Sequence, residues 1–205
     1  MQNKTTEKII LKAAKKVFIE KGFDGARMQE IADLAGINKA LLHYYFRSKE
    51  KMFDAVFEEA CFLFFPKISE IMNSELSLFE KIRTFVDVYI SVIVKNPHLP
   101  IFVLHELSRN SEKIADKIKS FGINPESLIK NIQEEMKLGE IIPIDPKQLI
   151  VNMLSLCIFP FVGKPIFQNL IFENDAKAYN KFIIDRKKEV ADFIINSISN
   201  KKYGL

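Results

Sequence analysis

The stretch from Arg27 to Phe46, RMQEIADLAGINKALLHYYF, limits the possible folds of this chain most. Its first half spaces apolar residues as one face of a short helix, at Met28, Ile31, Ala32 and Ala35. Gly36 then suits the left-handed position that ends a helix. Asn38 is a good N-cap for a second helix over Lys39 to Phe46. Two short helices joined by a glycine turn predict a helix-turn-helix, which places its second helix in the major groove of DNA.

The flanks of this stretch make the pattern specific. The matching blocks are Phe18…Gly22-Phe23, Glu30-Ile31-Ala32…Ala35-Gly36-Ile37 and Tyr45-Phe46…Ser48-Lys49-Glu50. On these residues, about the first third of the chain resembles the TetR family of transcriptional regulators. Two departures stand out: Ala26-Arg27 replaces the usual Thr or Ser cap, worth about 1 kcal/mol, and Ala40-Leu41 replaces a common Gly-Thr pair.

The composition predicts an all-α chain. Of 205 residues, 48% are hydrophobic and 27% charged, with only 7 Gly and 8 Pro and no long alternating, strand-like run. The resemblance implies about nine helices in two domains: a three-helix helix-turn-helix domain over residues 1–50, and a helical ligand-binding and dimerisation domain over residues 51–205.

Charge is concentrated where DNA binding is expected. Residues 1–51 contain 11 Lys and Arg against 6 Asp and Glu, while the remaining chain has 19 against 20. A basic excess confined to the helix-turn-helix segment favours binding to phosphates, because counterion release supplies most of the affinity for DNA. The alternative is that these lysines only keep a small helical domain in solution.

The second helix offers outward side chains to double-stranded DNA. Lys39 can reach a guanine or a phosphate, while Ala40 and Leu41 can touch thymine methyl groups. His43 and Tyr44 can donate to phosphates, although His43 could equally be a plain surface histidine and Tyr44 a core aromatic. By resemblance to the family, Tyr45 and Phe46 point inward and Tyr44 outward. The expected DNA contacts are Arg27, Met28, Gln29, Asn38, Lys39, Ala40, Leu41, His43, Tyr44 and Lys49, the last at a helix start that can bind phosphate.

Start and stop signals divide the rest of the chain into helices. A helix after Ser48 runs to Phe65, Pro66 kinks or ends it, and Lys67 to Met72 are expected to continue helical. Ser77 to Glu80 form a capping box, and Asn124-Pro125 and Asp145-Pro146 are N-caps followed by proline. The last helix is expected over Asp175 to Asn200.

The helical body after residue 50 has more apolar surface than one layer of helices needs. Of the 18 Phe in the whole chain, 14 lie between Phe57 and Phe193. Core packing is the simplest use, and the resemblance implies two others. A ligand cavity would be lined by Phe62, Phe65, Phe85, Tyr89, Phe102, His105, Phe121 and Cys157, with His105-Glu106 either its polar group or a surface pair. A homodimer interface would use Leu156, Phe159, Phe161, Phe182, Arg186, Val190 and Phe193.

Other classes of function lack their motifs. The chain has three His, no Gly-rich phosphate loop and no metal-ligand cluster, so we expect neither an enzyme nor a metal or cofactor. Cys61 and Cys157 lie in apolar runs typical of core residues in a reducing cytoplasm, and the longest apolar stretch is too short for a membrane span. We therefore expect a cytoplasmic repressor that binds a palindromic operator as a dimer and is released by a small, largely apolar ligand. The alternatives are a helical protein-binding module, or an activator without such a ligand.

Overall fold

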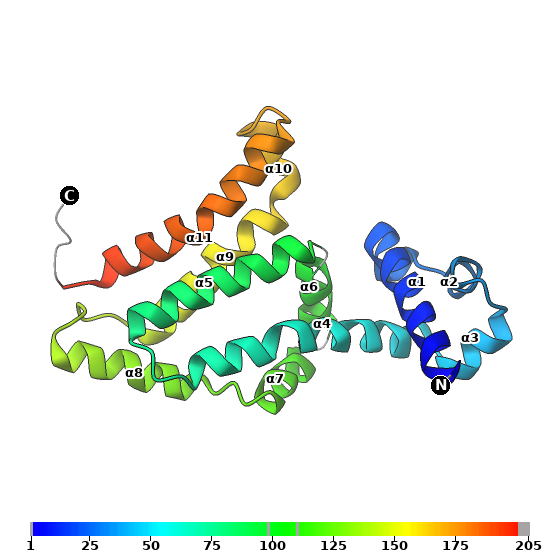
Figure 1. The fold of residues 1–205 in the computed structure, drawn as a ribbon, viewed down its shortest axis with the longest axis horizontal. Helices are drawn as coiled ribbons and strands as arrows, with labels where there is room; N and C mark the ends of the chain where they lie inside the picture. Colours follow the sequence, from blue (N-terminus) through cyan, green and yellow to red (C-terminus); the bar gives the residue numbers. More distant parts are fainter. Residues whose placement is uncertain (1, 98, 110, 201–205) are drawn as a thin grey trace. The chain divides into compact units, whose positions relative to one another are not determined.

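The computed structural model describes residues 2–97, 99–109 and 111–200, with residues 2–4, 106, 109 and 113 described as backbone only. These described residues form eleven helices rather than about nine, with a single isolated β-bridge between Ile141 and Ser199 (Figure 1). The all-α prediction is confirmed. The helices are α1 (Gln2–Gly25), α2 (Met28–Ala35), α3 (Lys39–Tyr45), α4 (Lys49–Met72), α5 (Leu78–Lys95), α6 (Leu99–Arg109), α7 (Ser111–Ser120), α8 (Pro125–Leu138), α9 (Pro146–Val162), α10 (Lys164–Leu170) and α11 (Ala176–Ile198).

The contacts divide the chain into two compact units. The first, here called the head unit, comprises Met1–Leu63 and Ile101–Arg109, and the second, the body unit, comprises Phe64–Pro100 and Asn110–Leu205. Helices α4 and α6 therefore have residues in both units. The domain boundary expected after residue 50 stays a prediction.

In the head unit, α1 is interrupted where the sequence pattern ends. Gly22 has φ 69° and ψ 177°, a conformation almost restricted to glycine, so the regular helix is interrupted after Lys21. The apolar faces of α1, α2 and α3 meet in one small core. Its members are Ile10, Ala14, Val17, Phe18, Ile31, Ala32 and Leu42, all at most 5% exposed.

The turn between α2 and α3 has the geometry expected of its residues. Gly36 adopts φ 68°, and its N–H donates to the Asp33 carbonyl at 3.1 Å while the Ile37 N–H donates to the Ala32 carbonyl at 3.0 Å. These paired bonds form a Schellman motif. The Asn38 side chain accepts from the Leu41 N–H at 2.8 Å, so the predicted N-cap is confirmed. At the start of α2, Arg27 makes no side-chain cap bond, as the sequence indicated.

An aromatic cluster joins α1, α4 and α6 within the head unit. The ring of Phe53 on α4 lies 5.1 Å from that of Phe18 and 5.2 Å from that of Phe23, both on α1. From α6, the rings of Phe102 and His105 lie 5.1 and 4.9 Å from Phe53. The aromatic cluster, defined as these five residues, gives α6 a packing role in the head unit.

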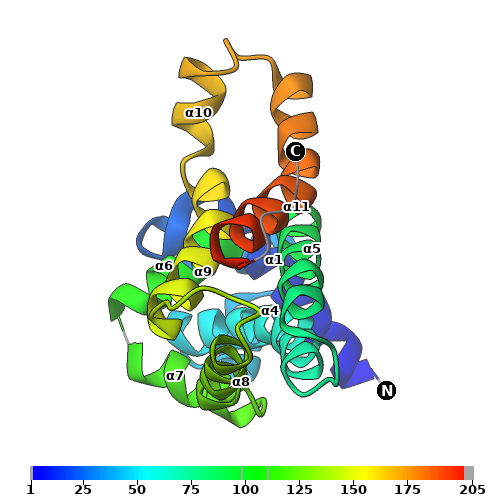
Figure 2. The ribbon, with the colours of Figure 1, turned by 90° about the vertical axis from the view of Figure 1, so that its left-hand side faces the viewer.

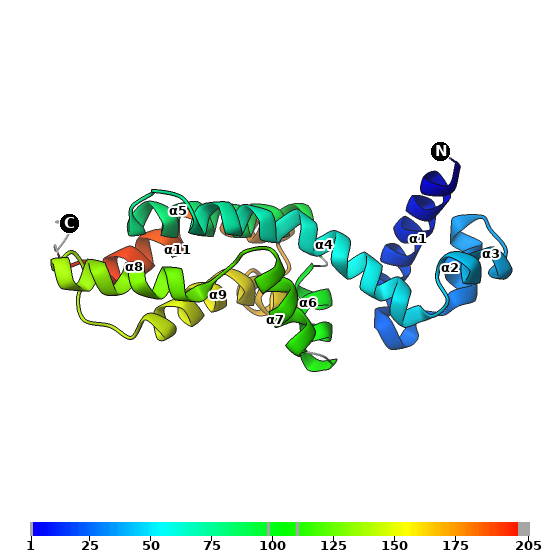
Figure 3. The same cartoon turned by 90° about the horizontal axis from the view of Figure 1, so that it is seen from below.

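In the body unit, α5 is the central helix. It packs most extensively on α11 and also contacts α9 and α8 (Figures 1 and 3). One face of α5, which includes Ile82, Val86 and Ile93, is almost completely buried in this core. The turn after α10 leads the chain back into α11 (Figure 2), where the Tyr179 hydroxyl donates to the Pro160 carbonyl at 2.6 Å.

Most predicted helix boundaries in the body are confirmed. Ser77 and Glu80 form the capping box, and Asn124 and Asp145 cap α8 and α9 ahead of their prolines. Pro66 does not end its helix, because α4 continues to Met72. Within the described residues, no single helix is long and apolar enough to cross a membrane. Two strongly bent pairs reach that length and composition together: Leu78–Lys95 with Leu99–His105, and Pro146–Val162 with Lys164–Leu170.

Candidate nucleic-acid interface and ligand cavity

The outer face of α3 is open. Leu42 is fully buried and Phe46 is 7% exposed, which fixes the orientation of the short helix. The side chains of His43 and Tyr44 and of the residues before Leu42 consequently point away from the core, with Tyr44 73% and Leu41 37% exposed, whereas Tyr45 is partly buried. The face, here called the α3 face, consists of Lys39, Ala40, Leu41, His43 and Tyr44, all exposed. Its composition suits contacts in a DNA groove, because it combines one cation, apolar groups and two side chains that can donate hydrogen bonds.

The other expected DNA contacts border this face along the chain. Arg27, Gln29 and Asn38 are exposed, whereas Met28 is only partly exposed. Gln29 Nε2 donates to Asp33 Oδ1 at 2.8 Å, which holds the amide along the surface of α2. Asn38 already uses its side-chain oxygen as the α3 cap, so its amide nitrogen is the group left for a ligand.

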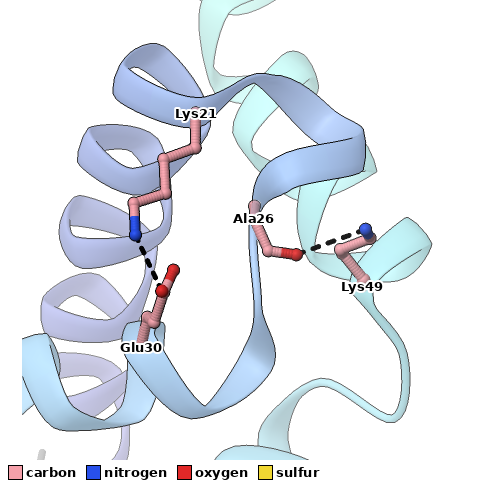
Figure 4. Close-up of polar contacts among 4 residues, drawn as sticks. All are labelled: Lys21, Ala26, Glu30 and Lys49. Carbon is pink, nitrogen blue, oxygen red and sulfur yellow. Dashed lines mark hydrogen bonds and ion pairs between the residues drawn. The ribbon is translucent and has the colours of Figure 1, made fainter.

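An ion pair fixes α2 against α1. Lys21 Nζ lies 2.7 Å from Glu30 Oε1 (Figure 4). The hydrogen bond from Lys21 holds the pKa of Glu30 below its ordinary value. Glu30 was recognised in the sequence only as part of the family pattern, and the structure gives it this specific partner.

Lys49 makes several contacts within the head unit. Its ammonium donates to the carbonyl of Ala26 at 3.2 Å (Figure 4) and to that of Asp24 at 3.4 Å, and it lies 4.5 Å from the centroid of the Phe23 ring. These contacts bind the first turn of α4 to the segment between α1 and α2. The Lys49 ammonium therefore stabilises the head unit, with at most part of its donor capacity left for a phosphate.

The body unit contains a cavity of about 220 Å³. Its walls come from α4, α5, α7, α8 and α9 and from the segment before α8. All but one of its lining residues are apolar, the exception being Lys81. A partly open space with apolar walls and one lysine at its border resembles the mostly apolar lining of small-molecule sites.

Comparison with known proteins identifies the helix-turn-helix. Residues 10–56 match the model of the bacterial regulatory proteins of the tetR family. Similar proteins are named as transcriptional regulators. One of them, HTH-type transcriptional regulator RutR of Escherichia coli O157:H7, is 28% identical over 148 residues, which is 70% of this chain and 68% of the relative. Residues 10–56 thus form a DNA-binding domain of the tetR family, and about 70% of the chain is similar to proteins named as transcriptional regulators, not as enzymes.

The likeness of this chain to its relatives extends into the body unit. HTH-type transcriptional regulator YhgD of Bacillus subtilis strain 168 is 27% identical over 163 residues, 74% of this chain and 80% of the relative. The crystal structure of HlyIIR, a hemolysin II transcriptional regulator, superposes with a TM-score of 0.65 at 28% identity, covering 97% and 99% of the two chains. AibR in complex with isovaleryl coenzyme A and operator DNA has a TM-score of 0.68 at 19% identity over 93% and 96%, which shows the shared fold.

Only some of the residues expected to line a ligand cavity lie at this cavity. Phe65 and Phe85 line the cavity. Two other expected residues contact these two without lining the cavity themselves: the Phe121 ring lies 5.5 Å from that of Phe65, and the Tyr89 ring 5.5 Å from that of Phe85. Cys157 is fully buried in the surrounding core.

The remaining expected lining residues lie in the head unit. Phe102 and His105 belong to the aromatic cluster, and Phe62 is 60% exposed. Helical periodicity shows that these residues lie on the apolar face of a helix. It does not show which other helix that face packs against. The side chain of Glu106, expected beside His105, lies outside the described residues.

The expected dimer residues fall into two groups. Phe159 and Phe193 are 59% and 64% exposed, whereas Val190 is buried and serves the core. Leu156, Phe161, Phe182 and Arg186 are partly exposed. Arg186 Nη2 donates to the Leu156 carbonyl at 2.6 Å, and burial lowers the pKa of its guanidinium.

Most of the residues that line this cavity were not predicted from the sequence. One wall is a stripe on α4 formed by Phe64, Ile68 and Ile71, whose spacing was visible in the sequence. Lys81 gave no such indication, because a lysine in the first turn of an amphipathic helix usually faces water.

Proposed function

We propose that this chain is a TetR-family repressor that binds a palindromic operator in double-stranded DNA as a homodimer and is released by a small, largely apolar ligand. The observation that supports DNA binding most directly is the α3 face, which is exposed on a capped helix whose opposite side is buried. Acting on the chromosome, such a repressor would work in the cytoplasm.

The proposed base contacts come from the start of α3. Lys39 would reach a guanine or a phosphate, and Ala40 and Leu41 would pack on thymine methyl groups. Tyr44, with 73% of its surface free, and His43 would donate to phosphates and set the register of the helix in the groove. Arg27 and Gln29 at the start of α2 would contact the adjacent backbone.

The proposed homodimer is supported by apolar surface on α9, α10 and α11. Single chains rarely expose large apolar patches unless another molecule covers them. In this part of the body unit six large apolar side chains are more than half exposed: Val151, Phe159, Ile166, Leu170, Ile171 and Phe193. A twofold pairing would present two α3 faces, which is what an operator with two symmetric half-sites needs.

The proposed response to ligand uses the helices that the two units share. Helix α4 contributes Phe64, Phe65 and Ile68 to the cavity in the body unit, and its first turns belong to the head unit. Helix α6 contributes Phe102 and His105 to the aromatic cluster in the head unit, while Leu99 and Pro100 belong to the body unit. A ligand that favours another arrangement of these helices by about 1–3 kcal/mol would change operator occupancy appreciably.

Selection from random duplex oligonucleotides by the purified full-length chain would test the DNA half of the proposal. We expect enrichment of an inverted repeat, with half-sites about one helical turn apart or slightly more. Tyr44→Glu should abolish the enrichment, since it places a negative charge on the α3 face. Leu138→Glu changes an equally exposed apolar residue on α8 and should leave it intact.

A promoter carrying the selected site would then test the direction of regulation. Repression predicts that the protein lowers transcription in a purified system. Enrichment of no sequence, or the same enrichment with Tyr44→Glu, would refute the proposed interface, and a rise in transcription would make the protein an activator.

A further inference from the structure

The cavity in the body unit is lined by apolar atoms, including the aliphatic part of one lysine side chain. Lys81, in the first turn of α5, is the only charged residue among those lining the cavity. The same residue also lines a separate polar groove of about 400 Å³ beside the first two turns of α8. Lys81 therefore marks the place where an apolar space adjoins a polar one.

The ammonium of Lys81 is available for a ligand. Among the residues that the structure describes, it has no carboxylate partner and no hydrogen-bond acceptor. Lys81 is partly exposed, and an anion beside its ammonium would be stabilising because a charge-assisted hydrogen bond is stronger than a neutral one. No acidic residue lines the cavity itself.

We propose that the ligand of this cavity is a small monocarboxylate with an apolar tail, the tail lying between α4, α5 and α9 and the carboxylate pairing with Lys81. This inference deepens the proposed function and rests on it for the regulatory consequence. It does not depend on DNA binding for its test.

The size of the cavity sets the size of the tail. A dry cavity of roughly 150 Å³ accommodates benzene, so a space of about 220 Å³ holds about nine carbon atoms by the same ratio. The walls that would contact such a tail include Phe64, Phe85, Ile82 and Met153, none of which offers a side-chain hydrogen-bond donor. The tail should therefore be a hydrocarbon without polar substituents.

The charged residues of the polar groove limit the head group of the ligand to one negative charge. Lys130 in the polar groove adds a second cation near the head group, whereas Glu126 and Glu134 in the same groove add two negative charges. A doubly charged phosphate monoester would gain the lysine contacts but meet these two carboxylates. An alkylammonium would place its charge next to Lys81, and an uncharged alcohol would leave the lysine without a counter-ion.

Isothermal titration calorimetry of the full-length protein with four eight-carbon probes tests the assignment. The probes are octanoate, 1-octanol, octylamine and octyl phosphate, which share one tail and differ in the head group. Because a hydrogen-bonded ion pair strengthens binding, octanoate should bind about tenfold more tightly than 1-octanol. Octylamine and octyl phosphate should both bind more weakly than octanoate.

Variants at Lys81 separate head-group recognition from tail burial. K81Q should weaken octanoate binding about tenfold and leave 1-octanol binding unchanged, while K81R should keep the preference for octanoate. K137Q, an exposed lysine on α8 outside both spaces, is the matched control and should behave as the native protein.

Two outcomes would overturn the inference: none of the probes binds, or octanoate and 1-octanol bind equally and K81Q changes neither. Octanoate binding that depends on Lys81 supports it whatever happens on DNA. If operator binding is then insensitive to octanoate, the proposed release mechanism fails and the site assignment stands.

Discussion

Lys49 shows how one residue can carry either a stabilising or a DNA-binding role. With two backbone carbonyls and the Phe23 ring around its ammonium, the contacts favour stabilisation of the head unit. We expect K49Q to lower the free energy of unfolding by about 1 kcal/mol, the lower range for hydrogen bonds to a charged group because the site is partly open to solvent. Thermal or urea unfolding measures this change.

The neighbouring lysine provides the control for Lys49. Lys51 is exposed, so K51Q should leave the unfolding free energy unchanged. If K49Q unfolds like the native protein but reduces the salt dependence of DNA binding, Lys49 contacts phosphate as the sequence suggested and the structural role is wrong.

Cys157 offers a chemical test of the body core. The side chain is fully buried, and burial raises the pKa of its thiol to about 12. Since only the thiolate reacts with alkylating agents, Cys157 should resist iodoacetamide at pH 8 in the folded protein and react after unfolding. A Cys61→Ala variant isolates the Cys157 signal in mass spectrometry, and rapid labelling of the folded variant would contradict the packing described for α9.

At the scale of elements, Gly36 determines whether α3 is correctly placed. Its φ of 68° is a left-handed conformation, which costs an ordinary side chain roughly 1–2 kcal/mol, while a Cβ there would meet no atom within 4 Å. Gly36→Ala should therefore destabilise the protein by about that amount and weaken DNA binding, as measured by unfolding and fluorescence anisotropy.

Gly139 is the matched control for Gly36. It ends α8 with φ 73°, and a Cβ there would also be free of contacts. Gly139→Ala should cost a similar free energy of unfolding without changing DNA affinity per folded molecule. Equal losses of DNA affinity in both variants would show that the α2–α3 turn has no special part in binding.

The elements differ in how well their sequence predicts them. The caps at Asn38, Ser77 and Asn124 and the turn at Gly36 follow from chemistry within a few residues of chain, and the structure confirms each. The exposed side of α3 followed from the family pattern, in which Tyr45 and Phe46 point inward. Such local rules worked because the partners are neighbours along the chain.

Long-range partners were beyond the reach of the sequence. The apolar faces of α5 and α6 were recognised, yet periodicity did not reveal that Phe85 borders a cavity while Phe102 packs on Phe53. The same limit explains Lys81, whose position beside an apolar space depends on the packing of α4, α8 and α9 around it. The helical continuation expected over Lys67 to Met72 is present, because α4 tolerates Pro66 and ends at Met72.

At the scale of the whole molecule, the account requires a dimer. Phe159 and Phe193 are the most exposed of the aromatic side chains assigned to the interface. Replacing either with Glu should raise the dimer dissociation constant at least about tenfold, since a buried interface aromatic contributes about 2 kcal/mol and the carboxylate would be desolvated. Sedimentation velocity over a range of protein concentrations measures the shift.

An exposed leucine outside the interface is the control for the dimer. Leu138→Glu, at a site 74% exposed on α8, should sediment like the native protein. A native chain that is monomeric at micromolar concentration, or Phe159→Glu and Phe193→Glu variants that remain dimeric, would remove α9 and α11 from the interface.

The central claim is that the α3 face enters a DNA groove, with phosphates held around it. The most direct measurement is the affinity of the full-length protein for its selected duplex as a function of salt concentration, with Lys39→Gln alongside. Six to ten phosphate contacts in a dimer predict a loss of about 10³-fold or more between 50 and 200 mM salt, and Lys39→Gln should weaken binding throughout. An affinity that is nearly independent of salt, or unchanged by Lys39→Gln and Tyr44→Glu, would contradict the account.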